Sequence, residues 1–215
     1  MAKDTAGKRE IYGLYAITPD EPDTGLLAAG VRAALTGGAK LVQYRNKTAT
    51  AVLRREQARV LLVLCRQHAA LLIINDHLDL ALEIDADGLH LGGEDGSIAA
   101  ARAELGPGKL IGASCYNLLQ KAVIAQREGA DYVAFGSFFV SSVKPGAVRA
   151  SLELLREAKQ RLSVPVVAIG GITLANAPHL LAAGADSVAI ISALFAAPDV
   201  SVAARQFNSL FGKQP

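Results

Sequence analysis

The chain has no tryptophan, and only 5% of its 215 residues are aromatic. Proteins that bind single-stranded nucleic acids usually stack the bases on aromatic side chains, so this scarcity argues against such a partner. The sequence also contains no block of lysine and arginine, and its formal net charge is only +2. A basic patch is the usual electrostatic mark of a nucleic-acid-binding protein. We therefore expect no nucleic-acid partner.

Long apolar runs are missing as well. No run approaches the roughly 20 apolar residues that a membrane-spanning helix needs, and the first ten residues, MAKDTAGKRE, hold no apolar stretch of signal-peptide length. The two cysteines, Cys65 and Cys115, lie too far apart to form a metal-binding pair. These absences predict a cytoplasmic protein without membrane contact or structural disulfides. Residues 1–10 are expected to form a loose tail.

What the sequence does contain is a series of short apolar runs, within a chain that is 51% apolar. Most are almost continuously apolar, which is typical of parallel strands that are buried on both faces. The eight runs are IYGLYAI, KLVQYR, LLIIN, DGLHL, KLIGAS, DYVAFG, PVVAIGG and DSVAII.

Helical patterns separate these runs, and glycines stand where several helices should end. Gly38, Gly129 and Gly184 can each adopt the left-handed conformation that caps a helix. The expected helices span residues 24–35, 51–68, 78–83, 97–105, 118–128, 151–161, 174–183 and 201–210. Eight strand–helix units predict a single (β/α)8 TIM barrel over residues 11–215. A doubly wound open sheet is the alternative, and it fits eight even units less well.

Three polar side chains alternate where the second strand ends, at Gln43, Arg45 and Lys47. Alternate residues of an extended chain point the same way, and active sites of barrels lie at the carboxyl ends of the strands. The guanidinium of Arg45 and the ammonium of Lys47 suit the oxygens of a phosphate. The alternative is a solvated surface with ordinary ion pairs.

Two aspartates follow the third and fourth strands, at Asp76 and Asp95. Mg²⁺ prefers oxygen ligands and usually takes one or two carboxylates together with substrate phosphates. Carboxylates beside phosphate-binding cations therefore indicate a magnesium site. The alternative is that each aspartate caps the helix that follows it.

A second anion is indicated at the ends of the last two strands. Gly170 and Gly171 allow close approach of backbone N–H groups. The segment SALF can form a short extra helix, with Ser192 as its cap and its dipole facing a phosphate. The alternative for the glycines is a simple strand-to-loop turn. One monophosphate and one metal-bound diphosphate at the same rim indicate a transferase.

Taken in order, several motifs resemble the thiamine phosphate synthase family over Ile11 to about Leu210. These motifs are YAITPD, VQYRNK, INDHLDLA, ADGLHLGGED, IGASC, ADYVAFGSFF and VVAIGGIT followed by AGADSVAIISALF. The resemblance implies an enzyme of thiamine biosynthesis that joins hydroxymethylpyrimidine diphosphate to hydroxyethylthiazole phosphate. It also implies Mg²⁺ as cofactor and a dissociative release of pyrophosphate.

The resemblance further implies which residues bind each substrate. The pyrimidine diphosphate would be bound by Gln43, Arg45, Lys47, Asn75, His90, Ser114 and Lys144. Among these, the catalytic residues would be Arg45, Lys47, Ser114 and Lys144. The thiazole phosphate would be bound by Ser141, Gly171, Ile191 and Ser192. The metal ligands would be Asp76 and Asp95.

Other readings stay open at this point. A thiazole tautomerase-like relative or a non-catalytic barrel that binds the thiazole or thiamine phosphate is the main alternative. In a phosphate-binding aldolase, Lys144 would form a Schiff base. The chain departs from the family pattern after the sixth strand, where Val143 stands at a threonine position, and Cys115 is assigned no role. The partners expected are small molecules, and a homo-oligomer is compatible with the sequence.

Overall fold

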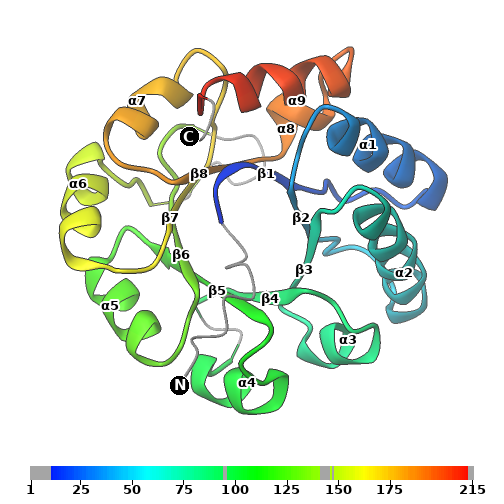
Figure 1. Ribbon diagram of the computed structural model, residues 1–215, viewed down its shortest axis with the longest axis horizontal. Coiled ribbons are helices and arrows are strands. Elements are labelled where there is room, and N and C mark those ends of the chain that lie inside the picture. The colour runs from blue at the N-terminus through cyan, green and yellow to red at the C-terminus, as the bar shows by residue number, and fades with distance from the viewer. Residues whose placement is uncertain (1–10, 94–95, 141–145, 147, 213–215) are drawn as a thin grey trace, which may run out of the picture.

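Eight parallel strands form a closed barrel in the computed structural model, which describes residues 11–93, 96–140, 146 and 148–212. Each strand pairs with its neighbour along the chain, and the first also pairs with the last. Figure 1 looks along the barrel and shows the helices as an outer ring. Pairing of the first and last strands confirms the (β/α)8 prediction and excludes the open sheet. The predicted tail, residues 1–10, lies outside the described residues.

Each predicted apolar run gives rise to one strand, and β5 continues two residues beyond its predicted run, to Tyr116. The strands are β1 (Gly13–Ile17), β2 (Leu41–Tyr44), β3 (Leu71–Asn75), β4 (Gly88–Leu91), β5 (Leu110–Tyr116), β6 (Tyr132–Phe135), β7 (Val166–Ile169) and β8 (Ser187–Ile190).

The predicted helices are also present. They are α1 (Thr24–Thr36), α2 (Ala51–Gln67), α3 (Leu78–Glu83), α4 (Ile98–Leu105), α5 (Leu119–Arg127), α6 (Leu152–Arg161), α7 (Ala177–Ala182), α8 (Ser192–Phe195) and α9 (Val200–Ser209). Helix α7 begins three residues later than predicted. The side chain of Asn176 accepts a hydrogen bond from Thr173 N at 2.8 Å, which holds the preceding residues in a turn.

The repeated helix-to-strand turns have a common construction. The three glycines predicted as caps have left-handed φ angles of 96°, 101° and 105°. The aspartate just before the next strand accepts a hydrogen bond from a backbone N–H near the start of the preceding strand, as Asp186 does from Val166 N at 2.7 Å. Asp87 and Asp131 do the same for Leu72 and Ile111. These aspartates therefore tie neighbouring strands at the amino end of the barrel, away from the strand ends that carry a site.

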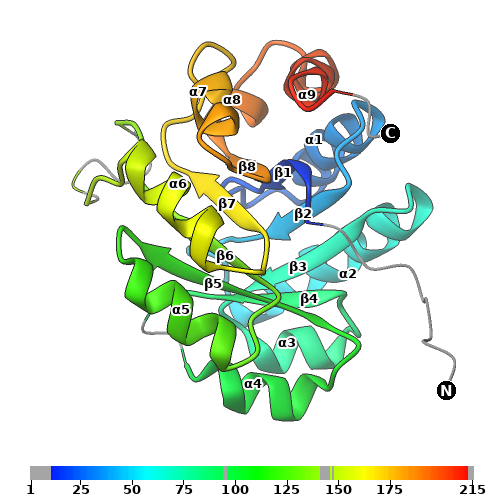
Figure 2. The ribbon, with the colours of Figure 1, turned by 60° about the vertical axis from the view of Figure 1, so that its left-hand side comes forward.

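The strands bury side chains on both faces, which produces two hydrophobic clusters. Inside the barrel lie Tyr15, Leu41 and Ile73, among others, while Val42 belongs to the larger cluster between the strands and the helices. Figure 2 shows the helices packed against the outer face of the strands. Because side chains alternate along a strand, Gln43 must point inward like Leu41. Inward positions at the carboxyl ends are the ones available to a ligand.

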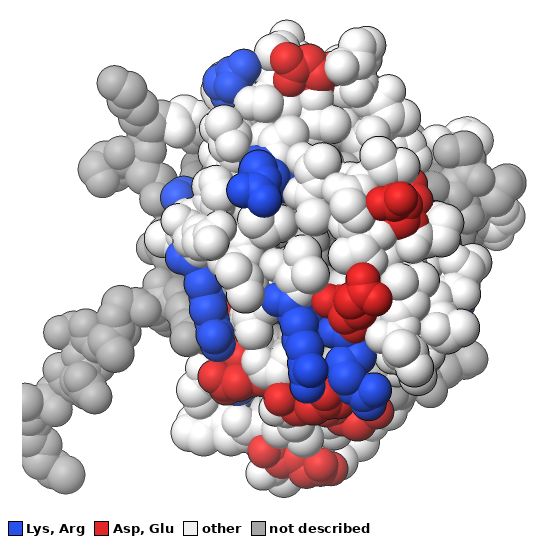
Figure 3. Space-filling view, turned by 90° about the vertical axis from the view of Figure 1, so that its right-hand side faces the viewer, with Lys and Arg blue, Asp and Glu red and all other residues white. Residues whose placement is uncertain are grey.

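Charges of both signs are mixed on the side of the molecule seen in Figure 3. On the protein surface, Arg55 and Arg59 both pair with Glu83, at 2.8 and 2.9 Å. Within the residues that the structure describes, no helix has the length and apolar character needed to cross a membrane.

Candidate active site

A cavity of about 790 Å³ opens among the carboxyl ends of the strands. Ten of the site residues predicted from the sequence line it: Gln43, Arg45, Lys47, Asn75, Asp76, His90, Ser114, Gly171, Ile191 and Ser192. The other three, Asp95, Ser141 and Lys144, lie outside the described residues. The barrel thus brings together every predicted site residue whose position is described, from six of its strands and the loops after them.

The cationic group after β2 is held in place by the loop after β1. The guanidinium of Arg45 lies 3.3 Å from a carboxylate oxygen of Asp20, and its side chain is only 13% exposed. The same oxygen accepts a hydrogen bond from the backbone N–H of Lys47 at 2.8 Å. Asp20 therefore holds the guanidinium of Arg45 and the backbone of Lys47 in place.

Thr18 completes this support. Its hydroxyl donates to the backbone oxygen of Arg45 at 2.8 Å and accepts from Arg45 N at 2.9 Å, and the residue is fully buried. Sequence reasoning gave neither Thr18 nor Asp20 a role, although both belong to the motif YAITPD. Their position just after β1 could have indicated this role, because β1 pairs with β2 in the barrel.

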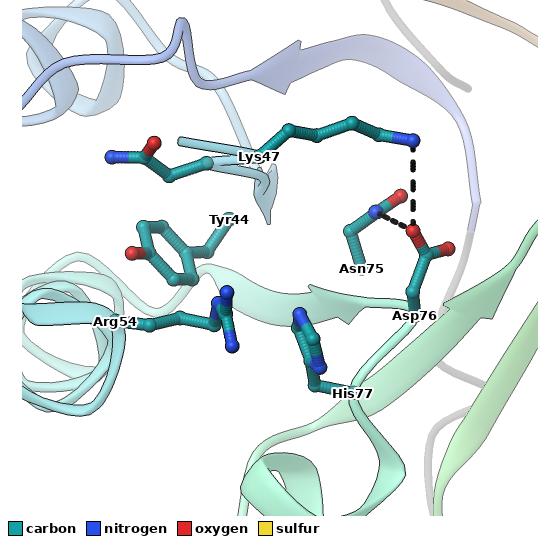
Figure 4. Close-up of a pocket in the computed structure, with 7 residues that line it drawn as sticks. Tyr44, Lys47, Arg54, Asn75, Asp76 and His77 are labelled. Atoms are coloured by element: carbon teal, nitrogen blue, oxygen red, sulfur yellow. Dashed lines mark hydrogen bonds and ion pairs between the residues drawn. The ribbon is translucent and has the colours of Figure 1, made fainter. Parts of the chain in front are cut away.

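Asp76 sits in a strained turn at the end of β3. Its φ angle is 63°, uncommon for a residue with a side chain, and His77 N donates to Asn75 O at 2.8 Å across it. The carboxylate accepts from Asn75 Nδ2 at 2.6 Å and lies 3.9 Å from Lys47 Nζ (Figure 4). Strain of this kind tends to persist where a side chain must be aimed at a ligand.

The alternative role of Asp76 as a helix cap is not supported, and the helix after β4 has another cap, while Asp95 itself lies outside the described residues. His77 occupies the N-cap position of α3, and its side chain makes no capping hydrogen bond. Ser97 caps α4, accepting from Ala100 N at 3.3 Å.

The donor set around Asp76 fits a magnesium ion that is also held by phosphate oxygens. Within the described part of the chain, no three acidic, histidine or cysteine side chains form a group that could hold a metal by themselves. Mg²⁺ does not need such a group, because it often takes one or two carboxylates and completes its shell with phosphates and water. Asp76 supplies one carboxylate at the cavity wall, beside the cations that would hold the phosphates.

A smaller pocket of about 290 Å³ adjoins the cavity and shares Lys47, Asn75 and Asp76 with it. Figure 4 shows Arg54 of α2 and His77 on its other side. The Nε atom of Arg54 is buried and has no hydrogen-bond partner among the described residues. A buried guanidinium nitrogen without a partner among the described residues, with Lys47 across the pocket, makes this pocket suited to an anion.

The opposite side of the cavity has the features of a phosphate cradle. Gly170 and Gly171 have φ angles of 103° and 64°, and an added Cβ at Gly171 would collide with the backbone at Phe139 and Val140. The loop after β7 therefore needs glycine here, so that backbone atoms lie at the cavity wall.

The short helix α8 is present, but the predicted role of Ser192 as its cap is wrong. Ile191 is the N-cap, and Ser192 is the first helical residue. The first N–H groups of a helix have no acceptor within the helix. At four residues, α8 contributes mainly these local N–H groups rather than a long aligned dipole. Ser192, although it is not the cap, lines the same cavity.

Alternation along β5 separates Ser114 from Cys115. Ser114 lines the cavity, whereas Cys115 is 1% exposed and packs in the outer cluster. Burial raises the pKa of the Cys115 thiol to about 12, so it stays protonated. This agrees with the absence of any role for Cys115 in the sequence analysis and excludes an exposed nucleophilic thiol.

His90 bridges Ser114 and a tyrosine that sequence reasoning missed. Its Nε2 lies 2.9 Å from Ser114 Oγ, and its Nδ1 lies 3.1 Å from the hydroxyl of Tyr132. Tyr132 in turn contacts the hydroxyl of Tyr15 at 2.7 Å. Both tyrosines lie in apolar runs, where their sequence gives no sign of a polar contact across the barrel.

Comparison with known proteins gives consistent results. Residues 14–194 match the family model described as thiamine monophosphate synthase. The chain is 55% identical over 209 residues to the thiamine-phosphate synthase of Nitrosospira multiformis, covering 97% of this chain and 89% of that protein. It is 56% identical over 201 residues to that of Methylobacillus flagellatus, covering 94% and 96%. The solved structure of thiamine phosphate pyrophosphorylase from Pyrococcus furiosus superposes with a TM-score of 0.83 at 38% identity, covering 94% of this chain and 96% of that one.

Proposed function

Because this chain belongs to the thiamine monophosphate synthase family, we propose that it joins hydroxymethylpyrimidine diphosphate to hydroxyethylthiazole phosphate and releases pyrophosphate. The chain is an enzyme of the transferase class, as its relatives' names and their identity over most of its length show. One observation supports the finer proposal best: a single cavity joins the cations after β2 to the glycine cradle after β7. That arrangement can hold a diphosphate and a monophosphate side by side.

The reaction needs stabilisation of a leaving anion more than proton transfer. The bond between the pyrimidine methylene carbon and the diphosphate oxygen breaks, and its electron pair leaves with pyrophosphate. The thiazole nitrogen then donates its lone pair to the methylene carbon, forming the new C–N bond. Arg45 and Lys47 would stabilise the departing charge: Asp20 holds the guanidinium of Arg45 before the reaction starts, and the ammonium of Lys47 lies at the cavity wall beside Asp76. Ser114 and Lys144 would assist them.

Asp76 and Asp95 would hold Mg²⁺ in this proposal. When bound, the ion would neutralise part of the charge on the diphosphate. The contact between Asp76 and Asn75 keeps the carboxylate oriented at the cavity wall, and Lys47 offsets its charge. The partners are therefore small molecules and a metal ion, while the cytoplasmic location and the oligomeric state stay predictions.

The thiazole phosphate would be bound by backbone N–H groups of the β7 and β8 loops, assisted by Ser192 and Ser141. Replacing Gly171 by alanine is expected to raise the KM for thiazole phosphate by roughly tenfold or more, because the new Cβ displaces the loop. The KM for the pyrimidine diphosphate should change much less. Steady-state kinetics with each substrate varied in turn measures both values.

Gly108→Ala is the matched control for this substitution, since nothing lies within 4 Å of a Cβ added there. It should leave both KM values within twofold of wild type. Equal rises in the two KM values of Gly171→Ala would contradict a phosphate cradle after β7.

The decisive test of the proposed function is release of pyrophosphate from purified protein that receives both substrates and Mg²⁺. Thiamine phosphate should form in equal amount, as detected by mass spectrometry. Omitting the thiazole phosphate or adding a chelator should stop the reaction. A tautomerase-like relative, an aldolase or a silent binding protein would release no pyrophosphate, so its absence under all conditions would refute the proposal.

A further inference from the structure

Five polar side chains form a continuous hydrogen-bonded chain across the inside of the barrel. Gln43 Nε2 donates to the hydroxyl of Tyr15 at 2.9 Å, and Tyr15 contacts the hydroxyl of Tyr132 at 2.7 Å. Tyr132 contacts His90 Nδ1 at 3.1 Å, and His90 Nε2 contacts Ser114 Oγ at 2.9 Å. The two ends, Gln43 and Ser114, line the cavity. The hydrogen-bonded chain therefore links three predicted ligands of the pyrimidine diphosphate, Gln43, His90 and Ser114, through two tyrosines with no assigned role.

The barrel interior is shaped around the middle of this chain. Tyr15 and Tyr132 are almost fully buried, with their rings edge to face and 6.0 Å between centroids. Gly112 stands beside them, and an added Cβ would collide with the ring of Tyr132 and with His90 Nδ1. Burial raises the pKa of both tyrosines well above the usual value, so each keeps its proton.

The number of protons on each group determines the donor-to-acceptor direction along this hydrogen-bonded chain. A tyrosine hydroxyl has one proton, so Tyr15, which accepts from Gln43, donates its own to Tyr132. Tyr132 then donates to Nδ1 of His90, which leaves a neutral His90 with its proton on Nε2. That proton goes to Ser114 Oγ, and the hydroxyl proton of Ser114 is left for a ligand. At the other end, Gln43 has its amide oxygen left for a ligand.

We propose that Tyr15 and Tyr132 are positioning residues that orient the Gln43 amide and the Ser114 hydroxyl for the substrate. This inference rests on the proposed function for its choice of ligand. An aminopyrimidine offers an N–H donor to the Gln43 carbonyl, and a diphosphate offers acceptor oxygens to the Ser114 proton. In the opposite direction of the hydrogen bonds, Gln43 would turn an N–H group toward the amine of the substrate. Ser114 would then donate its only proton to His90 and have none left for the diphosphate. One direction therefore matches both ends of the substrate.

The direction can be measured without substrate, from the ¹⁵N chemical shifts of the histidine rings in the full-length protein. The His90 signals are assigned by their loss in His90→Gln. We expect neutral His90 with its proton on Nε2. A proton on Nδ1, or a doubly protonated ring at neutral pH, would overturn the inference, whatever the enzyme's activity.

Tyr132→Phe tests the consequence for catalysis. It keeps the ring but removes the donor to Nδ1, so a share of His90 should shift to the Nδ1–H form. The kcat/KM for the pyrimidine diphosphate should fall by roughly tenfold, as expected for one lost buried hydrogen bond, while the KM for thiazole phosphate should stay within twofold. An unchanged tautomer together with unchanged kinetics would contradict the positioning role.

Tyr12→Phe serves as control. It also removes a tyrosine hydroxyl that donates a hydrogen bond, to Phe211 O at 2.8 Å, but Tyr12 does not line the cavity. It should change neither the tautomer nor the kinetics. If Tyr132→Phe does not fold, the wild-type tautomer still decides the question. If wild-type protein releases no pyrophosphate, the proposed function fails, and the tautomer measurement separates that failure from failure of this inference.

Discussion

Arg45→Met should lower kcat/KM for pyrophosphate release by about 10²–10³-fold, the loss typical of removing one preorganised donor to a developing anion. Arg45 is suited to such a role because Asp20 holds its guanidinium in place and little of the side chain is exposed. Methionine retains much of the side chain's apolar length but has no charge and no N–H donors. The loss should fall on kcat as well as KM, because the interaction strengthens as the pyrophosphate departs. Steady-state kinetics of pyrophosphate release measures it.

Two further variants make this result specific. Arg45→Lys keeps the charge but lacks the fork that grips two phosphate oxygens, so an intermediate loss is expected. Arg156→Met removes a surface arginine that pairs only with Glu153 at 2.7 Å among the described residues, and it should stay within twofold of wild type. If Arg45→Met behaved like Arg156→Met, the cations after β2 would not be the diphosphate site.

The second large effect is expected from Asp76→Asn. Losing one carboxylate ligand should remove most of the stimulation by Mg²⁺ and lower turnover by roughly 10²-fold or more, since a metal of this kind contributes several kcal/mol. Asparagine has the size of aspartate and tolerates a φ angle of 63°, so the turn between Asn75 and His77 should persist. Rates measured across a range of Mg²⁺ concentrations give the effect on catalysis. Calorimetric titration of the protein with Mg²⁺, in the presence of pyrophosphate, gives the effect on metal binding.

Asp79→Asn provides the comparison within the same segment. Asp79 is exposed in the first turn of α3 and does not line the cavity, so both Mg²⁺ binding and turnover should match wild type. A half-saturating Mg²⁺ concentration for Asp76→Asn equal to that of wild type would remove Asp76 from the metal site. Asp95, the second predicted ligand, can be replaced by asparagine in the same assay.

The side-chain chemistry of the cavity was predictable because it depends on short-range rules. Near-continuous apolar runs indicated buried parallel strands, and the carboxyl ends of such strands meet at one end of a barrel. The alternation of side chains along β2 was therefore enough to place Gln43 and Arg45 together. The roles of these residues in binding stay predictions that the variants above would test.

The supporting contacts were not predictable in the same way. Asp20 meets Arg45 across 25 residues of sequence, and Arg54 reaches the smaller pocket from a helix that resembles any amphipathic helix. The predicted cap at Ser192 failed for a related reason. The exact start of a four-residue helix depends on the backbone conformation of Ile191 just after β8, and no local sequence pattern predicts that conformation.

The order of the strands, the inward or outward direction of each side chain and the glycine turns all follow from the sequence itself, because periodicity and backbone preference act between near neighbours. Only the folded barrel decides that Tyr15 meets Tyr132, 117 residues away, and that His90 and Ser114 continue their chain. A buried hydroxyl accepts whichever partner closure of the barrel brings within reach. That choice depends on strand register and on the space that Gly112 leaves, which are properties of the whole fold.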